Sequence, residues 1–187
     1  MTVDTNILNP VGSIELDIFE WKVPDDLPLQ EFKYSDPKLV LRSIPQCTKE
    51  LVLEMMDVVG LYDDRSIVID YKVRDLKSGD FGSGLYGYHL DCTNNIHDDF
   101  EPETHIIYST VIGTKIITNP INVQGYKSVE DVLRNEVVVE QSAKVNAIHK
   151  YTSKVLHSCP IMPVDSQRLL IRVTSGFRER IQYAKKH

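Results

Sequence analysis

The residues best suited to chemistry are a histidine and an aspartate near the middle of the chain. His89 and Asp91 lie two residues apart in the stretch YGYHLD (residues 86–91), which we expect to be extended. Residues i and i+2 of an extended chain point to the same face, so both side chains can reach one point. A neutral imidazole and a carboxylate in this arrangement are two of the three ligands of the facial triad that binds ferrous iron. A second histidine would complete it.

His157 is the histidine best placed to be that third ligand. It ends an apolar segment and precedes Ser158-Cys159-Pro160, where the chain must turn, so we expect it at the end of a strand. A zinc site formed by His89, His97 and His105 is a conceivable alternative. Their eight-residue spacing matches no usual zinc pattern, however.

Other side chains could compete for a metal. Asp98 and Asp99 follow His97 directly and are rival carboxylates. Cys159 lies two residues after His157 and could face the same way, although a small buried thiol is the commoner role for such a cysteine.

Two arginines lie on the strand that we expect after His157. Alternation over Arg168–Thr174 puts Arg168 and Arg172 on one face, with Leu170 between them. Arginines on a buried face are costly unless each meets an anion, and a bound dicarboxylate would be such an anion. The two lie roughly 13 Å apart along an extended chain, so one carboxylate cannot easily bind both.

Short strands must position these residues. Apolar alternation predicts strands over Ser13–Val23, Lys38–Ile44, Ile67–Val73, His105–Val111, Lys115–Thr118 and Arg168–Thr174, and two strands or a hairpin over Lys144–Leu156. No βαβ rhythm is visible, which argues against a parallel doubly wound sheet. An antiparallel sandwich or barrel carrying a few helices fits best.

Three helices are expected beside these strands. The clearest covers Lys49–Val59, with Thr48 as its N-cap and Gly60 just after its end. A capping box at Ser128 opens a short helix, and a short basic helix follows Gly176.

Composition indicates one soluble globular domain. The chain has 187 residues, of which 42% are apolar and 26% charged, and no apolar run approaches the roughly 18 residues of a membrane span. We expect a single domain over residues 1–187, a loose segment over 1–12, and a core over about 67–175. The net charge of −6 gives no general attraction for nucleic acid, although a local basic groove stays open.

Cysteine usage and the N-terminus indicate the compartment. Cys47, Cys92 and Cys159 are odd in number and widely spaced, which argues against a disulfide framework and a zinc ribbon. The first residues lack the basic and apolar regions of a signal peptide. We therefore expect a cytoplasmic protein.

The ordered set of His89-Leu90-Asp91, a distal His157, and Arg168 or Arg172 in a following strand resembles the iron(II)/2-oxoglutarate-dependent dioxygenases. The resemblance covers roughly Val73 to Thr174. It implies a mainly β fold with flanking helices, namely a cupin-like double-stranded β-helix, or jelly roll.

The resemblance also implies roles for the residues that carry it. His89, Asp91 and His157 would bind Fe(II), and 2-oxoglutarate would chelate that metal. Arg168 or Arg172 would hold the far carboxylate, and we favour Arg168 because it is nearer the turn that leaves His157. Arg172 would then meet the other carboxylate, the substrate or an acidic side chain.

The implied reaction is hydroxylation of an unidentified substrate, with decarboxylation of 2-oxoglutarate to succinate. A small molecule, a protein side chain or a nucleobase could be that substrate. Tyr108 and Thr110 could offer hydroxyls to the 2-oxoglutarate. We expect a substrate lid in residues 92–103 or 122–143.

Two other readings compete with this one. The protein could be a non-catalytic jelly-roll binding or structural protein with an incidental His-x-Asp. It could also be a metal-dependent cupin enzyme that does not use 2-oxoglutarate. Such an enzyme would not need Arg168 on the face that carries the site.

Overall fold

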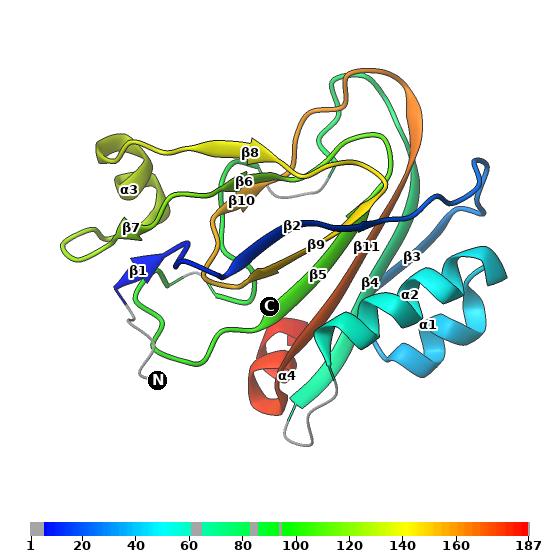
Figure 1. Ribbon diagram of the computed structural model, residues 1–187, viewed down its shortest axis with the longest axis horizontal. Coiled ribbons are helices and arrows are strands. Elements are labelled where there is room, and N and C mark those ends of the chain that lie inside the picture. Colours follow the sequence, from blue (N-terminus) through cyan, green and yellow to red (C-terminus); the bar gives the residue numbers. More distant parts are fainter. Residues whose placement is uncertain (1–5, 61–64, 83–85, 94, 187) are drawn as a thin grey trace.

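The computed structural model describes residues 6–60, 65–82, 86–93 and 95–186, and within them the fold is mainly β with antiparallel sheets and a few helices (Figure 1). The elements are β1 (Ile7–Leu8), β2 (Ile14–Glu20), β3 (Gln30–Ser35), α1 (Pro37–Ser43), α2 (Gln46–Val59), β4 (Arg65–Leu76), β5 (Thr104–Ser109), β6 (Lys115–Ile117), β7 (Ile121–Asn122), α3 (Val129–Asn135), β8 (Glu140–Ser142), β9 (Ala147–Thr152), β10 (His157–Ser158), β11 (Ser166–Phe177) and α4 (Arg178–Lys186).

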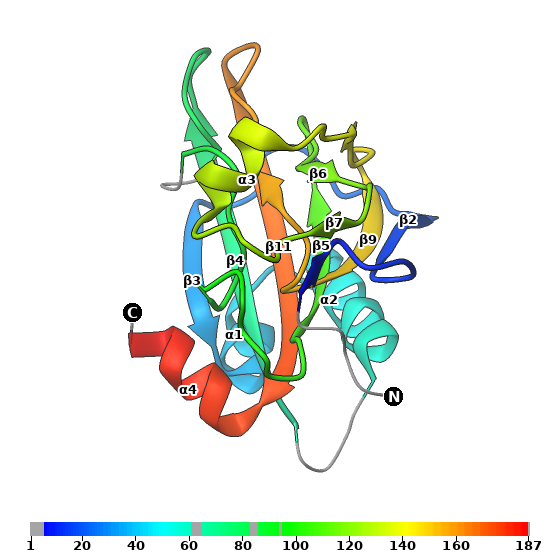
Figure 2. The same ribbon diagram turned by 90° about the vertical axis from the view of Figure 1, so that its left-hand side faces the viewer.

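The largest sheet has six strands in the order β2-β9-β5-β11-β4-β3, with antiparallel neighbours throughout (Figure 2). Its two longest strands, β4 and β11, pair over their whole length, from Ser166 opposite Leu76 to Phe177 opposite Arg65. A smaller sheet has the order β10-β6-β8. The two sheets share an apolar cluster that includes Ile107 of β5 and Ile116 of β6.

The strands from β4 to β11 pair in a nested way. β4 pairs with β11, β5 with β9, and β6 with β8. His89, which follows β4, forms an isolated antiparallel bridge with His157 at the start of β10. The first of these segments therefore pairs with the last, the second with the second-to-last, and so on inward.

Helices α1 and α2 cover one face of the large sheet (Figure 1). Leu169, Ile171 and Val173 of β11 point to that face and join the apolar core beneath the helices. Side chains alternate along a strand, so Arg168 and Arg172 must point to the opposite face, toward the smaller sheet.

The strand predicted over Lys38–Ile44 is wrong, because this segment forms helix α1. The Asp36 side chain accepts hydrogen bonds from the backbone amides of Lys38 and Leu39, and Pro37 occupies the first turn. Both features are helix-start signals and outweigh the short apolar alternation. The next helix, α2, begins at Gln46, earlier than predicted, with Pro45 rather than Thr48 at the N-cap position.

Most other elements agree with the sequence pattern. The strands predicted over Ile67–Val73 and Arg168–Thr174 are present and longer than expected. The region 144–156 contributes strand β9 and the turn that leads to β10, so β9 and β10 lie in different sheets and form no hairpin. Ser128 caps α3 as predicted, its hydroxyl accepting from the Asp131 amide.

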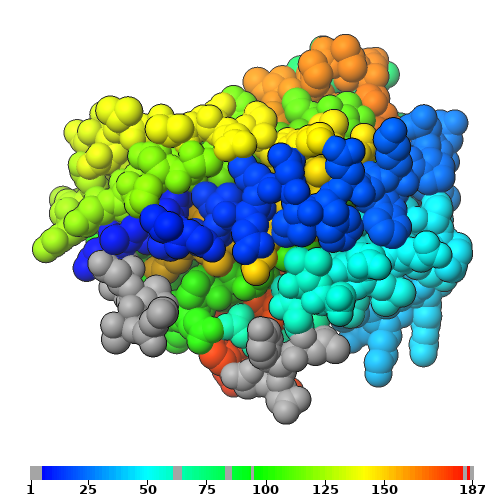
Figure 3. Space-filling model, viewed as in Figure 1, coloured from blue at the N-terminus to red at the C-terminus, as the bar shows by residue number. Residues whose placement is uncertain are grey.

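The N-terminal segment is anchored where the structure describes it, although we expected residues 1–12 to be loose. Ile7 and Leu8 pair with β7, and the Leu8 side chain is fully buried. The chain then runs across the surface as β2, at one edge of the large sheet (Figure 3). In the described part of the chain, no helix has the length and apolar character to span a membrane.

Candidate metal centre

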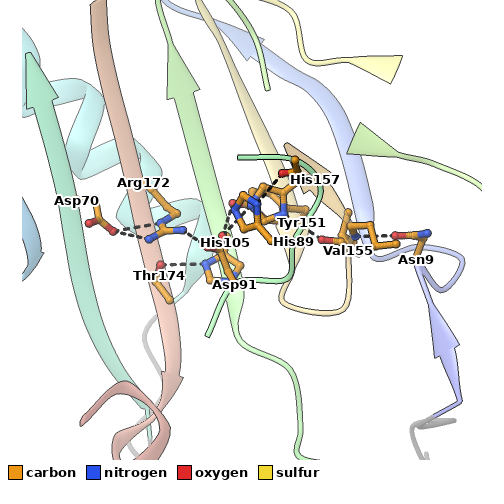
Figure 4. Close-up of polar contacts among 12 residues, drawn as sticks. Asn9, Asp70, His89, Asp91, His105, Tyr151, Val155, His157, Arg172 and Thr174 are labelled. Atoms are coloured by element: carbon orange, nitrogen blue, oxygen red, sulfur yellow. Dashed lines mark hydrogen bonds and ion pairs between the residues drawn. The ribbon is translucent and has the colours of Figure 1, made fainter. Parts of the chain in front are cut away.

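His89, Asp91 and His157 come together and could hold a metal ion. One ligand atom from each lies within 4.8 Å of the others. His157 and Asp91 are buried, and His89 is partly buried. The structure therefore brings together the three residues that the sequence singled out (Figure 4).

Backbone pairing joins the two histidines. The amide of His89 donates to the carbonyl of His157 at 3.0 Å, and the amide of His157 donates back at 3.2 Å. The ring centroids lie 4.5 Å apart. We expected a strand around His89, but the residue makes only this isolated bridge. The bridge is nevertheless enough to place both imidazoles on one side of the small sheet.

Hydrogen bonds at Nδ1 set the orientation of both imidazoles. Nδ1 of His89 lies 3.1 Å from the carbonyl oxygen of Gly87, and Nδ1 of His157 lies 3.0 Å from that of Val155. A carbonyl only accepts, so each Nδ1 carries a proton, which leaves Nε2 as the ring nitrogen available to a metal. Partners of this kind at the remote nitrogen are typical of metal-binding histidines.

Three side chains surround the Asp91 carboxylate. The Tyr151 hydroxyl donates to Oδ2 at 2.8 Å, His157 Nε2 lies 3.2 Å from the same oxygen, and Arg172 Nη1 lies 2.5 Å from Oδ1. Burial alone would raise the pKa of Asp91, but Arg172 and His157 hold it well below its usual value. The aspartate is therefore charged, as a metal ligand must be.

His89 is kept neutral by its surroundings. Burial lowers its pKa, and the neighbouring His157 lowers it further. A neutral imidazole is the form that binds a metal. Two imidazoles and one carboxylate form a donor set typical of non-haem ferrous sites. Metal bonds of about 2.1 Å at right angles would place ligand atoms about 3 Å apart, close to the separation of His157 Nε2 from Asp91 Oδ2.

Arg172 meets acidic side chains, one of the outcomes that the sequence left open. Its Nη2 and Nε lie 2.9 Å and 3.1 Å from Oδ2 of Asp70, while Nη1 contacts Asp91. Asp70 is its cross-strand partner on β4. Arg172 thus bridges a carboxylate of the sheet and a carboxylate of the metal centre (Figure 4).

Arg168 lies in a different electrostatic setting on the same face of β11. It is 3% exposed, and it donates to Ser109 Oγ at 2.9 Å and to the Gly82 carbonyl at 3.0 Å. Its Nη1 also lies 3.5 Å from Cys159 Sγ. Across the described ranges no carboxylate forms an ion pair with it, and burial lowers its pKa.

Glycine is required next to this guanidinium. A Cβ on Gly82 would overlap Arg168 Nη1 and Cys159 Sγ. The backbone at residue 82 therefore approaches Arg168 closely enough to accept its hydrogen bond. Cys159, for which the sequence left a position near the metal open, lies beside this arginine.

Two residues of the site, Ser109 and Tyr151, were not anticipated, and His105 was considered only as a zinc ligand. Ser109 orients Arg168, and Tyr151 donates to Asp91. His105 is fully buried beside the Tyr151 ring, with Nδ1 at 2.9 Å from Thr174 Oγ1 and, among the residues that the structure describes, no partner at Nε2. Burial lowers the pKa of His105 to about 3. Alternation along β5 puts His105 and Ser109 on one face, a signal that could have identified them.

The hydroxyls of Tyr108 and Thr110, which could serve a bound 2-oxoglutarate, make contacts within the protein. Tyr108 points to the helix-covered face, where its hydroxyl donates to the Trp21 carbonyl and Asn146 Oδ1. The Thr110 hydroxyl accepts from the Leu169 amide. Side chains alternate along β5, so Tyr108 lies on the same face as Ile106, and Ser109 lies on the opposite face.

The rival ligands are engaged elsewhere. Asp98 pairs with Arg180 at 2.8 Å, and His97 Nε2 lies 2.8 Å from the Tyr126 carbonyl. Arg180 also binds the buried Glu103 at 2.8 Å. Arg180 of the basic helix α4 therefore binds this helix to Asp98 and Glu103. Ile96 lies in the first expected lid segment, and Leu90 lies just before it. Both belong to one apolar cluster with Val123 and Val132 of the second expected segment. The substrate lid itself stays a prediction.

Neither a protein-family model nor a curated protein matches this chain.

Proposed function

We propose that the protein is an Fe(II)- and 2-oxoglutarate-dependent oxygenase built on a double-stranded β-helix. One observation carries the proposal. Arg168 is a buried arginine with neutral acceptors around it, on the same strand face as Arg172, which contacts the carboxylate of the candidate metal centre. A buried cation without an anionic partner is costly, so a dicarboxylate ligand near the metal would explain its presence.

The strand pairing supports the fold part of the proposal. In a jelly roll, the first and last strands pair, as do the second and seventh, the third and sixth, and the fourth and fifth. Here β4 pairs with β11, His89 with β10, β5 with β9, and β6 with β8. The metal ligands would then lie on the second strand, just after it, and on the seventh strand.

The cofactors would occupy the space between the two sheets. His89 and His157 would bind Fe(II) through Nε2, and Asp91 through a carboxylate oxygen. With 2-oxoglutarate bound, the metal would supply oxygen activation, and the oxoacid would supply electrons by its decarboxylation to succinate. Arg168 would bind the far carboxylate of the oxoacid with a guanidinium already buried and oriented.

Residues around Arg168 support this binding role. Ser109 accepts from Arg168 Nε while its own hydroxyl faces the carbonyls of Thr110 and Ile112. The guanidinium plane is therefore fixed before any ligand arrives, which lowers the entropy cost of binding. Leu170, between the two arginines, packs into the apolar cluster with Ile107 and helps to keep water away from the site.

Anaerobic titration of the purified protein with Fe(II) and then 2-oxoglutarate tests the proposal. We expect the weak visible charge-transfer band of the metal chelate, and its loss in His157→Ala. His97→Ala, which changes an exposed histidine outside the centre, should keep the band. Absence of iron binding in the wild-type protein would overturn the proposal.

The co-substrate needs its own variant. Arg168→Met should raise the 2-oxoglutarate Kd by at least about 30-fold, because losing one partner of a buried charge pair costs about 2–5 kcal/mol. Metal affinity should stay within about twofold of the wild type. Metal binding without any 2-oxoglutarate binding would instead favour a cupin enzyme that works without the oxoacid. Binding of both with no turnover on any substrate class would favour a non-catalytic protein.

A further inference from the structure

Asp70 and Asp91 lie on opposite sides of one guanidinium (Figure 4). Arg172 Nη2 is 2.9 Å from Oδ2 of Asp70, and Nη1 is 2.5 Å from Oδ1 of Asp91. The carboxylate of Asp70 is 3% exposed and that of Asp91 is 6% exposed. Because these groups are withdrawn from water, their pairing determines where each can sit.

The position of Arg172 is fixed from several sides. It is directly opposite Asp70 in the β11–β4 register, so the contact needs no flexible loop. The Tyr34 ring lies beneath the guanidinium, with its centroid 5.5 Å from Cζ. The Tyr34 amide donates to the other oxygen of Asp70 at 3.3 Å. Arg172 therefore presents Nη1 to Asp91 from a rigid support.

The two oxygens of Asp91 are differentiated by their partners. Oδ1 is bound by Arg172, and Oδ2 lies 3.2 Å from His157 Nε2. A cation shared by Asp91 and His157 would contact these last two atoms. The Tyr151 hydroxyl donates to Oδ2 as well, at 2.8 Å. A carboxylate oxygen has two lone pairs, so Oδ2 can accept from Tyr151 and still bind a metal.

We infer that Arg172, held by Asp70, is a positioning residue that keeps Asp91 a one-oxygen metal ligand through Oδ2. This inference rests on the metal centre of the proposed function but not on the use of 2-oxoglutarate. Without Arg172, Oδ1 could swing toward the cation and take a second coordination position. With it, that position stays open for other ligands.

The charges agree with this role. One guanidinium faces two carboxylates, so the cluster of Asp70, Arg172 and Asp91 has an excess negative charge in a buried site. A divalent cation would offset that excess. The two arginines therefore differ in role, because Arg172 is paired with two carboxylates and Arg168 is paired with none among the described residues.

Mn(II) and Co(II) titrations of the full chain test the inference. Arg172→Lys keeps the charge but cannot reach two carboxylates with one planar fork, and Asp70→Asn leaves Arg172 without its support. Loss of partners that orient metal ligands typically costs 10–100-fold in metal affinity. We therefore expect the Mn(II) Kd to rise about 10- to 100-fold in both variants, and the visible d–d absorption of bound Co(II) to change.

A matched substitution controls for the loss of any arginine fork. Arg74→Lys alters an arginine of β4 that is paired with Glu31 rather than with the residues of the centre. The Mn(II) Kd should stay within about twofold of the wild type, and the Co(II) spectrum should not change. Circular dichroism of each apo variant reports folding. If Arg172→Lys does not fold, Asp70→Asn and Tyr151→Phe decide the outcome.

The results separate the two proposals. Wild-type Mn(II) affinity and an unchanged Co(II) spectrum in folded Arg172→Lys or Asp70→Asn would overturn the positioning role and leave the oxygenase proposal standing. Weakened metal binding in these variants, in a wild-type protein that binds metal but no 2-oxoglutarate, would support the positioning role while the oxygenase proposal fails. A wild-type protein that binds no divalent metal would overturn both.

Discussion

Arg168 and Arg172 share one face of β11 but meet opposite electrostatic surroundings. Arg172 lies between the carboxylates of Asp70 and Asp91. Arg168 is more deeply buried, yet in the described part of the protein its partners are a hydroxyl, a carbonyl and a thiol. Arg172 is therefore held by two carboxylates of the fold, whereas Arg168 has no anionic partner among the described residues.

This difference predicts unequal effects on stability. Arg172→Met should lower the unfolding free energy by about 3–5 kcal/mol, because it leaves two buried carboxylates without their cation. Arg168→Met removes a buried charge that has no anionic partner, so its unfolding free energy should stay within about 1 kcal/mol of the wild type. Urea unfolding of the apo proteins measures both values. Equal losses in the two variants would contradict the assignment of Arg168 as an unpaired cation.

Metal binding should stabilise the folded protein. The unfolded chain cannot keep His89 and His157 paired, so a cation bound at the centre adds about 2.7 kcal/mol at 100 times its Kd. For a chain of this size, the melting temperature should rise by roughly 5–10 °C. Thermal melting with and without Mn(II) measures the shift. His89→Ala should abolish it and His97→Ala should retain it, whereas equal shifts in both variants would place the metal elsewhere.

Gly82→Ala should weaken 2-oxoglutarate binding without touching the metal ligands. The added Cβ would overlap the Arg168 guanidinium and Cys159 Sγ, so Arg168 must move. We expect the 2-oxoglutarate Kd to rise at least about tenfold, a loss of about 1.4 kcal/mol, with the Mn(II) Kd unchanged. Calorimetric titration provides both constants. Cys159→Ala, which opens space at the same place, should bind 2-oxoglutarate within about twofold of the wild type, and a similar loss there would point to the thiol instead.

Acid should destabilise the protein through His105. Its pKa is lowered to about 3 by burial, whereas a histidine in the unfolded chain titrates near 6.5. Between these values the unfolded state binds a proton that the folded state does not. The contribution of neutral His105 to the unfolding free energy is therefore complete above pH 6.5. It falls by about 3 kcal/mol between pH 7 and pH 4.

Urea unfolding over that pH range measures the effect. His105→Phe removes the titrating group and should flatten the dependence, while His97→Ala should leave it as in the wild type. An equally steep loss of stability in His105→Phe would show that other groups control the acid response.

Local patterns were sufficient for much of the site. Alternation over residues 168–174 identifies the face of β11 that carries both arginines. The two-residue spacing of His89 and Asp91, together with the turn after His157, indicates that the three can converge. The sequence also contains the N-cap signal of α1 at Asp36, but the apolar alternation after it led to the prediction of a strand over Lys38–Ile44.

Contacts that depend on long-range register could not be read from the sequence. Asp70 meets Arg172 because β4 and β11 pair in one particular register, which no local pattern specifies. The surroundings of Tyr108 have the same origin, because they depend on which face of the sheet α1 and α2 cover.

With metal bound at the proposed centre, the bridge between His89 and His157 would also link metal supply to the lifetime of the protein. A bound cation would tie residues 86–93 to β10 through side chains in addition to the two backbone hydrogen bonds. Without metal, that segment should open more often, and proteases cleave segments in proportion to the time they spend open. We therefore expect iron scarcity to speed degradation and lower the cellular abundance of the protein even when its synthesis is constant.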